Sequence, residues 1–267
     1  MTTFFVLKKN NDLFHLEPIL NYHILNPMFT FKQFAIHQDR CAMKVGTDGV
    51  LLGAWARVEH LEPCHRILDI GTGTGLIALM AAQRSRAAIV GIDLDEAAVT
   101  QATENAACSP WSHRIRMVRG DIRSITHELS SDDNRPQFDA LLCNPPYFEN
   151  ALRCPDAQRT MARHTDTLTF DELARSAAEL LTPEGELSVV IPFDRAMDMT
   201  VSAASHGLFA TRQTIVCPYE GAKPKRILMA FSRQGAAHTP ETLCIQNAQR
   251  CHTPEYRKLV EAFYLKM

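Results

Sequence analysis

The sequence predicts an α/β protein built on a mostly parallel seven-stranded sheet with an antiparallel hairpin at one edge. Two observations carry this prediction. From residue 66 onward, short apolar runs rich in β-forming residues alternate with helical stretches, which is typical of repeated βα units. The last two of these runs have no helical stretch between them, so we expect them to pair as a hairpin.

The elements are expected in the following order. The strands are Arg66–Ile70, Ala88–Asp93, Ile115–Arg119, Phe138–Cys143, Glu186–Pro192, Thr211–Pro218 and Arg226–Ser232. The helices are Gly75–Arg84, Glu96–Cys108, Phe170–Leu181 and Pro254–Phe263. Gly221 and Pro224 are turn signals, so the segment Tyr219–Lys225 closes the hairpin.

Length and composition set the organisation of the chain. At 267 residues it is long enough for one α/β domain with appendages. We expect an N-terminal extension at residues 1–28, a lid and helix at residues 29–65, and the main domain at residues 66–267. No run of 18 apolar residues could cross a bilayer, and the N-terminus lacks the pattern of an export signal. We therefore expect a cytoplasmic protein.

The composition also argues against several classes of protein. The eight cysteines contain no C-x-x-C pair, and none of the eleven histidines lies in an H-E-x-x-H array, so we expect neither a disulfide framework nor a metal site. There is no G-x-S-x-G elbow and no P-loop. The net charge of −2 gives no overall attraction to nucleic acid, so such a substrate would need a local basic patch.

A glycine-rich turn follows the first expected strand. The sequence DIGTGTG contains Asp69, Gly71, Gly73 and Gly75 and leads directly into a helix. Because glycine has no Cβ, such a turn lets backbone N–H groups come close to a ligand. The third glycine comes one residue too early for the nicotinamide fingerprint G-x-G-x-x-G. The spacing resembles the D/E-x-G-x-G-x-G loop of methyltransferases that use S-adenosylmethionine (SAM), although the loop alone could be a tight turn without a ligand.

Acidic residues stand at the ends of the next two strands. The carboxylate of Asp93 can accept hydrogen bonds from both hydroxyls of a ribose. Asp121 follows the third strand, where SAM-dependent methyltransferases place an acidic residue near the adenine amino group. Each could instead cap the following helix, and Asp95 or Glu96 could take that position beside Asp93. Open α/β sheets bind ligands at the carboxyl ends of their strands, so three such positions together favour a SAM site.

The fourth strand ends in the tetrapeptide Asn144-Pro145-Pro146-Tyr147. The lone pair of an aromatic amine is delocalised into its ring, so attack on a sulfonium methyl is easier when two acceptors hold the N–H bonds. The Asn144 side-chain oxygen and the Pro145 carbonyl can supply these acceptors, and Tyr147 offers a flat face for stacking. A neutral amine needs no general base before transfer. A proline-stiffened turn is the simpler alternative, but after a SAM-type loop the tetrapeptide predicts methylation of an exocyclic nitrogen.

Several stretches resemble the bacterial tRNA(Val) adenine-37 N6-methyltransferase family. The stretches are FTFKQF at 29–34, HQDRCAMKVGTDGVLLGAWA at 37–56, SPW at 109–111, NPPY at 144–147 and AFYLKM at 262–267. The resemblance covers residues 29–267. It implies a Rossmann-like SAM methyltransferase fold, SAM as the cofactor, and N6 of adenine 37 of tRNA(Val) as the acceptor.

The tetrapeptide leaves other acceptors open. A glutamine of a release factor or a guanine N2 of ribosomal RNA would suit the same NPPY motif. A SAM-binding and RNA-binding module without catalysis is a third alternative, against which the intact motif argues.

Residues of the stretches at 29–34 and 37–56, together with basic residues later in the chain, complete the expected site. Lys44 and Thr47 lie in a loop that we expect to close over the methionine end of SAM. Asp48 belongs either to this loop or to the N-cap of the next helix, and both interpretations stay open. The expected contacts with RNA phosphates are Lys32, Arg40, Arg153, Arg159, Arg163, Lys223, Lys225 and Arg226. Solvated surface charge is the alternative for each of them.

Overall fold

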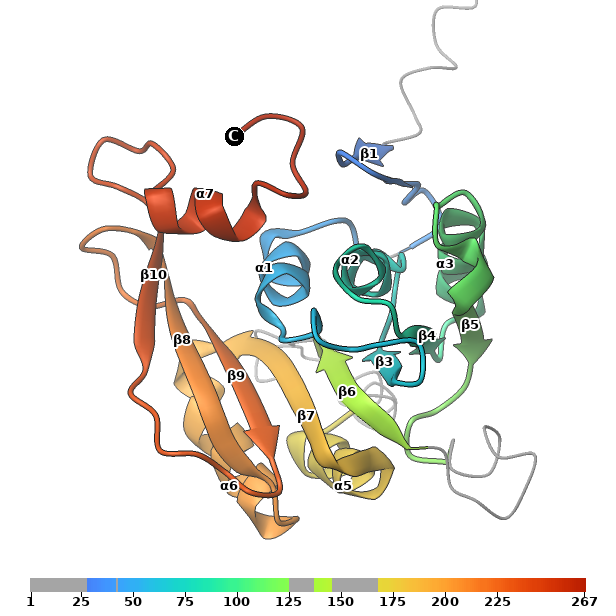
Figure 1. Cartoon of the computed structure of the whole chain (residues 1–267). Helices are drawn as coiled ribbons and strands as arrows, with labels where there is room; N and C mark the ends of the chain where they lie inside the picture. The colour runs from blue at the N-terminus through green and yellow to red at the C-terminus, as the bar shows by residue number, and fades with distance from the viewer. Residues whose placement is uncertain (1–27, 42, 125–136, 146–167) are drawn as a thin grey trace, which may run out of the picture.

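The computed structural model describes residues 28–41, 43–124, 137–145 and 168–267 (Figure 1). Its strands are β1 (Phe29–Thr30), β2 (Ala35–Ile36), β3 (Arg66–Ile70), β4 (Ala88–Asp93), β5 (Ile115–Arg119), β6 (Phe138–Cys143), β7 (Leu181–Pro192), β8 (Phe209–Tyr219), β9 (Arg226–Ser232) and β10 (Glu241–Gln246). Its helices are α1 (Thr47–Trp55), α2 (Leu76–Arg84), α3 (Glu96–Ala107), α5 (Phe170–Leu180), α6 (Ala196–Ser205) and α7 (Pro254–Val260), with 3-10 turns η1 (Ser112–Arg114) and η2 (Phe193–Arg195).

An eight-stranded mixed sheet forms the centre of the molecule, in the order β10-β8-β9-β7-β6-β3-β4-β5. Strand β9 is antiparallel to both of its neighbours, and all other pairs in this sheet are parallel. The predicted fold class, a Rossmann-like and mostly parallel sheet with an antiparallel hairpin, is therefore confirmed. The carboxyl ends of every strand except β9 lie at one edge of the sheet, and this edge carries the candidate site.

The prediction missed one strand and one helix of the main domain. The sheet has eight strands rather than seven, because β10 pairs in parallel with β8 and places the β8–β9 hairpin one strand inside the edge. The sequence of β10, ETLCIQ, gave a weak signal since Leu243 is its only buried residue. Helix α6 between β7 and β8 was also missed, because only Met199 and Ala203 of its ten residues are buried.

Helices cover both faces of the sheet (Figure 1). Helices α1, α2 and α7 share one hydrophobic cluster on the first face, and α5 and α6 share a second cluster on the other face. Successive residues of a strand point to opposite faces, so Ile67 of β3 joins the first cluster while Leu68 and Ile70 join the second. Among the described residues, no helix is long and apolar enough to span a membrane.

The N-terminal hairpin is attached to the core by the C-terminal segment. Phe31 forms an isolated bridge with Tyr264, and the N–H of Lys32 donates to the carbonyl of Phe263 at 2.7 Å. The rings of Phe31 and Phe34 stack with centroids 4.7 Å apart. The expected helix at the C-terminus ends earlier than predicted, at Val260, and frees the following residues to make these contacts.

Candidate active site

A cavity of about 280 Å³ opens at the carboxyl edge of the sheet, near the lower end of the roughly 300–1,000 Å³ typical of small-molecule sites. Strands β3 and β6 are neighbours at this edge, with Ile70 opposite Cys143. The chain leaves β3 toward β4 and β5 on one side, whereas β6 and β7 lie on the other. This reversal is the topological switch point, where open α/β sheets bind their ligands.

The glycine loop contributes to the wall of the cavity. Gly71 and Gly73 line it and have φ values of 69° and 53°, in the left-handed region that favours glycine. The N–H groups of Gly71 and Thr72 both donate to the carbonyl of Ile92 on β4, which fixes the loop against the next strand. Gly75 does not line the cavity; a Cβ at this position would lie 3.3 Å from Ala102 Cβ, so Gly75 serves the packing of α2 against α3.

Asp69 is fully buried and shapes the loop from below. Its Oδ2 accepts hydrogen bonds from Thr72 Oγ1 at 2.7 Å and from the N–H of Ala78 at 3.1 Å, while Oδ1 has no hydrogen-bond partner. Burial raises the pKa of this carboxyl to about 7; the two hydrogen bonds oppose the rise and the nearby Asp93 adds to it. Asp69 supports the loop and is not among the residues that line the cavity; its contact with a cofactor stays a prediction.

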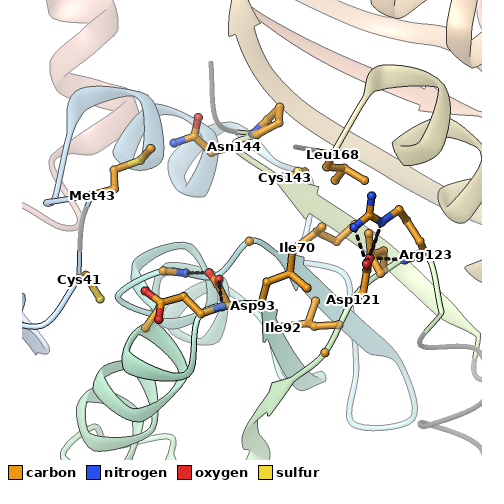
Figure 2. A pocket seen from close by; sticks show the side chains of 18 residues that line it. Cys41, Met43, Ile70, Ile92, Asp93, Asp121, Arg123, Cys143, Asn144 and Leu168 are labelled. Carbon is orange, nitrogen blue, oxygen red and sulfur yellow. Dashed lines mark hydrogen bonds and ion pairs between the residues drawn. The ribbon is translucent and has the colours of Figure 1, made fainter. Parts of the chain in front are cut away.

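Asp93 lies in the cavity at the end of β4 (Figure 2). Its Oδ2 accepts from the N–H of Gly73 at 2.9 Å, and its Oδ1 accepts from the N–H of Asp95 at 3.0 Å. Asp95 is the N-cap of α3, since its side chain accepts from the N–H of Ala97 at 2.9 Å. Asp95 rather than Asp93 therefore caps α3, and each carboxylate oxygen of Asp93 keeps a lone pair that can accept a hydrogen bond from a ligand.

Asp121 also lies in the cavity, but its carboxylate is held by an arginine that the sequence interpretation missed. Arg123 Nε donates to both oxygens of Asp121, at 2.9 and 2.8 Å, and a terminal nitrogen of Arg123 lies 2.6 Å from Oδ2 (Figure 2). Arg123 lines the cavity and pairs with Glu172 of α5 at 3.4 Å. These contacts with Arg123 hold the pKa of Asp121 below its usual range. A ligand here would meet a carboxylate–guanidinium pair rather than a lone carboxylate.

The first half of the NPPY tetrapeptide faces the same cavity. Asn144 and Pro145 follow β6 and line the cavity together with Cys143 (Figure 2). Burial raises the pKa of the Cys143 thiol above its usual range, so Cys143 contributes an uncharged thiol to the wall of the cavity. Pro146 and Tyr147 lie outside the described residues, as do Arg153, Arg159 and Arg163.

The N-terminal segment reaches the cavity through different residues from those expected. Cys41 and Met43 line it, whereas neither Lys44 nor Thr47 is among the lining residues of the described chain. The Lys44 ammonium donates to the carbonyl of Gln38, and Thr47 begins α1. Cys41 and Met43 carry no motif of their own, so only the position of their segment brings them to the site.

Asp48 is not the N-cap of α1 and is not among the residues that line the cavity. The N-cap of α1 is Gly46, without a side-chain cap, and Asp48 lies in the first helical turn. The carboxylate of Asp48 accepts from Arg226 Nε at 2.8 Å. Arg226 is half-buried in this ion pair, which links α1 to β9; its contact with RNA phosphate stays a prediction.

The N-terminal segment is fastened by buried amides of α3. Asn105 accepts from the N–H of His37 at 2.9 Å and donates to the carbonyls of His37 and Thr74 at 2.8 and 2.9 Å. Gln101 accepts from the N–H of Arg40 at 3.2 Å. Asn105 thus ties the segment before Cys41 directly to the glycine loop.

The other basic residues that were expected to contact RNA lie at separate places on the described surface. Arg40 pairs with Glu104 at 2.8 Å, and Lys32 Nζ donates to the carbonyl of Glu261 at 2.6 Å. Lys223 and Lys225 are exposed in the turn between β8 and β9. Among the described residues no group of three or more His, Cys, Asp or Glu side chains could hold a metal ion.

The described residues fit SAM at this cavity. Nothing lies within 4 Å of a Cβ built on Gly71, so a ligand can approach the loop backbone. Asp93 could receive ribose hydroxyls, and the lining residues Ile92, Leu94 and Ile122 could provide an apolar wall for an adenine ring. The carboxylates of Asp93 and Asp95 give the site the negative charge that suits a sulfonium cation.

We expect Asp93→Ala to weaken SAM binding by about 1.5–3 kcal/mol, because hydrogen bonds to a charged group are lost. Calorimetric titration with SAM measures this change. Glu184→Ala is the matched control, since it removes an exposed carboxylate near the start of β7, at the opposite edge of the sheet. Unchanged SAM affinity of the Asp93 variant would remove Asp93 from the site.

A Rossmann-like sheet with a glycine loop and an Asn-Pro turn at neighbouring strand ends defines a SAM-dependent methyltransferase. Residues 47–206 match the family model "Methyltransferase small domain". The chain is 48% identical over 244 residues to a tRNA1(Val) (adenine(37)-N6)-methyltransferase of Bacteroides thetaiotaomicron, covering 91% of this chain and 99% of the relative. A relative of the same name in Tolumonas auensis is 44% identical, covering 90% of this chain and 97% of the relative. The chain belongs to the tRNA1(Val) (adenine(37)-N6)-methyltransferase family.

A solved structure supports the fold independently. A protein of Agrobacterium tumefaciens, described as a predicted O-methyltransferase, superposes with a TM-score of 0.60 and covers 81% of this chain and 96% of its own. The two sequences are 21% identical, so the likeness concerns the fold alone.

Proposed function

We propose that this protein transfers the methyl group of SAM to N6 of adenine 37 in tRNA(Val). One observation of the structure carries the chemistry: Asn144 and Pro145 line the same cavity as Gly71, Gly73 and Asp93, at two neighbouring strands of the switch point. The relatives at 44–48% identity carry the name of this tRNA and this adenine and support the choice of acceptor.

The described residues have distinct roles in this proposal. SAM supplies an electrophilic methyl group on a sulfonium. The Gly71–Gly73 backbone and Asp93 hold the cofactor, and Asp121 with Arg123 lies at the adenine end. Asn144 and the Pro145 carbonyl accept the two N–H bonds of the target amine and direct its lone pair toward the methyl group. Alignment provides most of the rate, and the proton leaves after transfer.

The same proposal includes a role for Tyr147 and the location of the protein in the cell. Tyr147, outside the described residues, stacks on the target adenine once that base has left the stack of its loop. We expect the protein in the cytoplasm, together with its tRNA substrate.

The acceptor is tested with labelled SAM and three separate substrates: tRNA lacking only this modification, ribosomal RNA, and release factor. We expect label in tRNA(Val) alone, at N6 of adenine 37. Label in release factor or ribosomal RNA instead would assign the same motif to another acceptor. Binding of SAM and tRNA without transfer would identify a non-catalytic module.

Lys223 and Lys225 are proposed to contact phosphates of the tRNA, since both are exposed at the sheet edge that carries the cavity. We expect the double variant Lys223→Glu with Lys225→Glu to raise the KM for tRNA about tenfold or more at about 50 mM salt and to leave SAM affinity unchanged. Arg226 is left intact because it pairs with Asp48. Steady-state kinetics at increasing salt measure the effect, and an unchanged KM at low salt would remove both lysines from the interface.

A further inference from the structure

Beyond the cavity, one residue has an unusual backbone. Arg250 has a φ of 64°, whereas every other described residue with a positive φ is a glycine. The left-handed region is disfavoured for residues with a Cβ and is visited by single residues that local contacts hold there. Such outliers collect at functional sites, which makes Arg250 a candidate for a role in binding.

The turn that contains Arg250 is rigidly built. Asn247 Oδ1 accepts from the N–H groups of Gln249 and Cys251, both at 3.0 Å. The N–H of Arg250 donates to the carbonyl of Asn247 at 3.0 Å, and the N–H of Asn247 donates to the carbonyl of Cys251 at 2.8 Å. Glu220 Oε2 accepts from the N–H of Ala248 at 3.1 Å and joins this turn to the β8–β9 turn. The backbone therefore fixes the point from which the Arg250 side chain projects.

The guanidinium of Arg250 lies over an aromatic ring. Its Cζ lies 3.6 Å from the ring centroid of Tyr219, at the end of β8. Stacking uses the face of the guanidinium and leaves its N–H donors in the plane, where they match the oxygens of a phosphate. Arg250 and the residues next to it in the turn are exposed, and none of the ion pairs among the described residues includes Arg250.

The stacked pair lies on the same side of the sheet as the cavity. Strands β6, β8 and β10 run parallel within the sheet, so Asn144, Tyr219 and the Arg250 turn all follow carboxyl ends at one edge (Figure 1). Strand β8 is three positions from β6 and β10 is four, which at about 4.8 Å per strand gives about 14–19 Å. At about 3.4 Å per stacked nucleotide, this distance corresponds to four to six nucleotides.

We propose that Arg250, stacked on Tyr219, docks a phosphate of the RNA backbone several nucleotides from the methylated base, next to Lys223 and Lys225. The docking surface extends the acceptor site of the proposed function, on which this inference rests. It contributes affinity for a tRNA stem-loop and does not contact SAM.

The variant Arg250→Gly tests the effect of the guanidinium on tRNA binding without a change in the conformation of the turn. Glycine accepts a positive φ, so the variant keeps the turn and removes only the guanidinium. We expect its Kd for unmodified tRNA(Val) transcript to rise about three- to tenfold at low salt. The slope of log K against log salt should fall in magnitude by about 0.7–0.9, the value for one phosphate contact. The Kd for SAM should be unchanged, and the Tm unchanged or higher because the disfavoured conformation is relieved.

The matched control is Arg86→Ala, which removes an exposed guanidinium from the opposite edge, between α2 and β4, and should leave tRNA binding unchanged. Filter binding across a salt series measures both variants. A wild-type slope for Arg250→Gly, an equal loss for Arg86→Ala, or a marked fall in Tm for Arg250→Gly would each overturn the docking role. If wild-type protein fails to methylate tRNA while the slope change persists, the proposed function fails and the docking surface stands.

Discussion

We expect Asn144→Ala to lower kcat by about a hundredfold to a thousandfold, comparable with the loss of one oxyanion-hole contact. Asn144 lines the cavity directly after β6, beside the glycine loop of the neighbouring strand. Its side-chain oxygen would hold one N–H of the target amine only when the acceptor is in place, so the loss falls on the transition state. Single-turnover kinetics with saturating tRNA and SAM measure the rate of the chemical step.

Two comparisons separate this role from a structural one. The affinity of Asn144→Ala for SAM should hardly change, since Asp93 and the glycine loop hold the cofactor. Asn144→Asp keeps an acceptor oxygen in the same place and should lose less activity than Asn144→Ala. A fully active Asn144→Ala enzyme would refute the mechanism.

The central strands and the residues at their ends could be predicted from the sequence. Strands β3, β4 and β6 are short, mostly buried and apolar, and each ends at or just before a glycine or polar residue at the edge of the sheet. Asp93 and Asn144 were accordingly expected at the edge that now carries the cavity. The sequence pattern is clear here because a buried apolar strand is followed directly by the polar residue of the site.

Other features depend on tertiary contacts that no local pattern encodes. Strand β10 has a single buried residue and is defined by its pairing with β8, so its sequence lacks the alternation of a half-buried strand. Arg123 reaches the cavity through its pair with Asp121, and Arg226 is withdrawn from solvent by Asp48, 178 positions away in the chain. A long basic side chain can either extend into solvent or reach a binding site. The sequence does not distinguish these two positions, and the fold does.

The second large effect concerns Asp69 and the dependence of stability on pH. Burial raises the pKa of Asp69 to about 7 in the folded protein from an ordinary value near 3.8, and Oδ1 lacks a hydrogen-bond partner that would favour the ionised form. Below about pH 4 the carboxyl is protonated in both states. Between about pH 4 and pH 7 the unfolded chain is ionised while the folded protein still binds the proton. The free energy of unfolding therefore falls through this window, by at most about 4 kcal/mol, and is level above it.

We expect Asp69→Asn to remove this loss, because an amide does not ionise and can still accept from Thr72 and Ala78 through its oxygen. Relative to the wild type, the variant should gain about 2–3 kcal/mol of unfolding free energy between pH 5 and pH 8. Urea unfolding of both proteins without ligand at the two pH values gives this difference, in which any pH-independent cost of the amide cancels. Asp194→Asn removes the same charge from an exposed site, so it shows how much of the change comes from net charge alone. If the stability difference between wild type and Asp69→Asn is the same at both pH values, Asp69 is ionised in the folded protein across this range, and burial does not control its protonation.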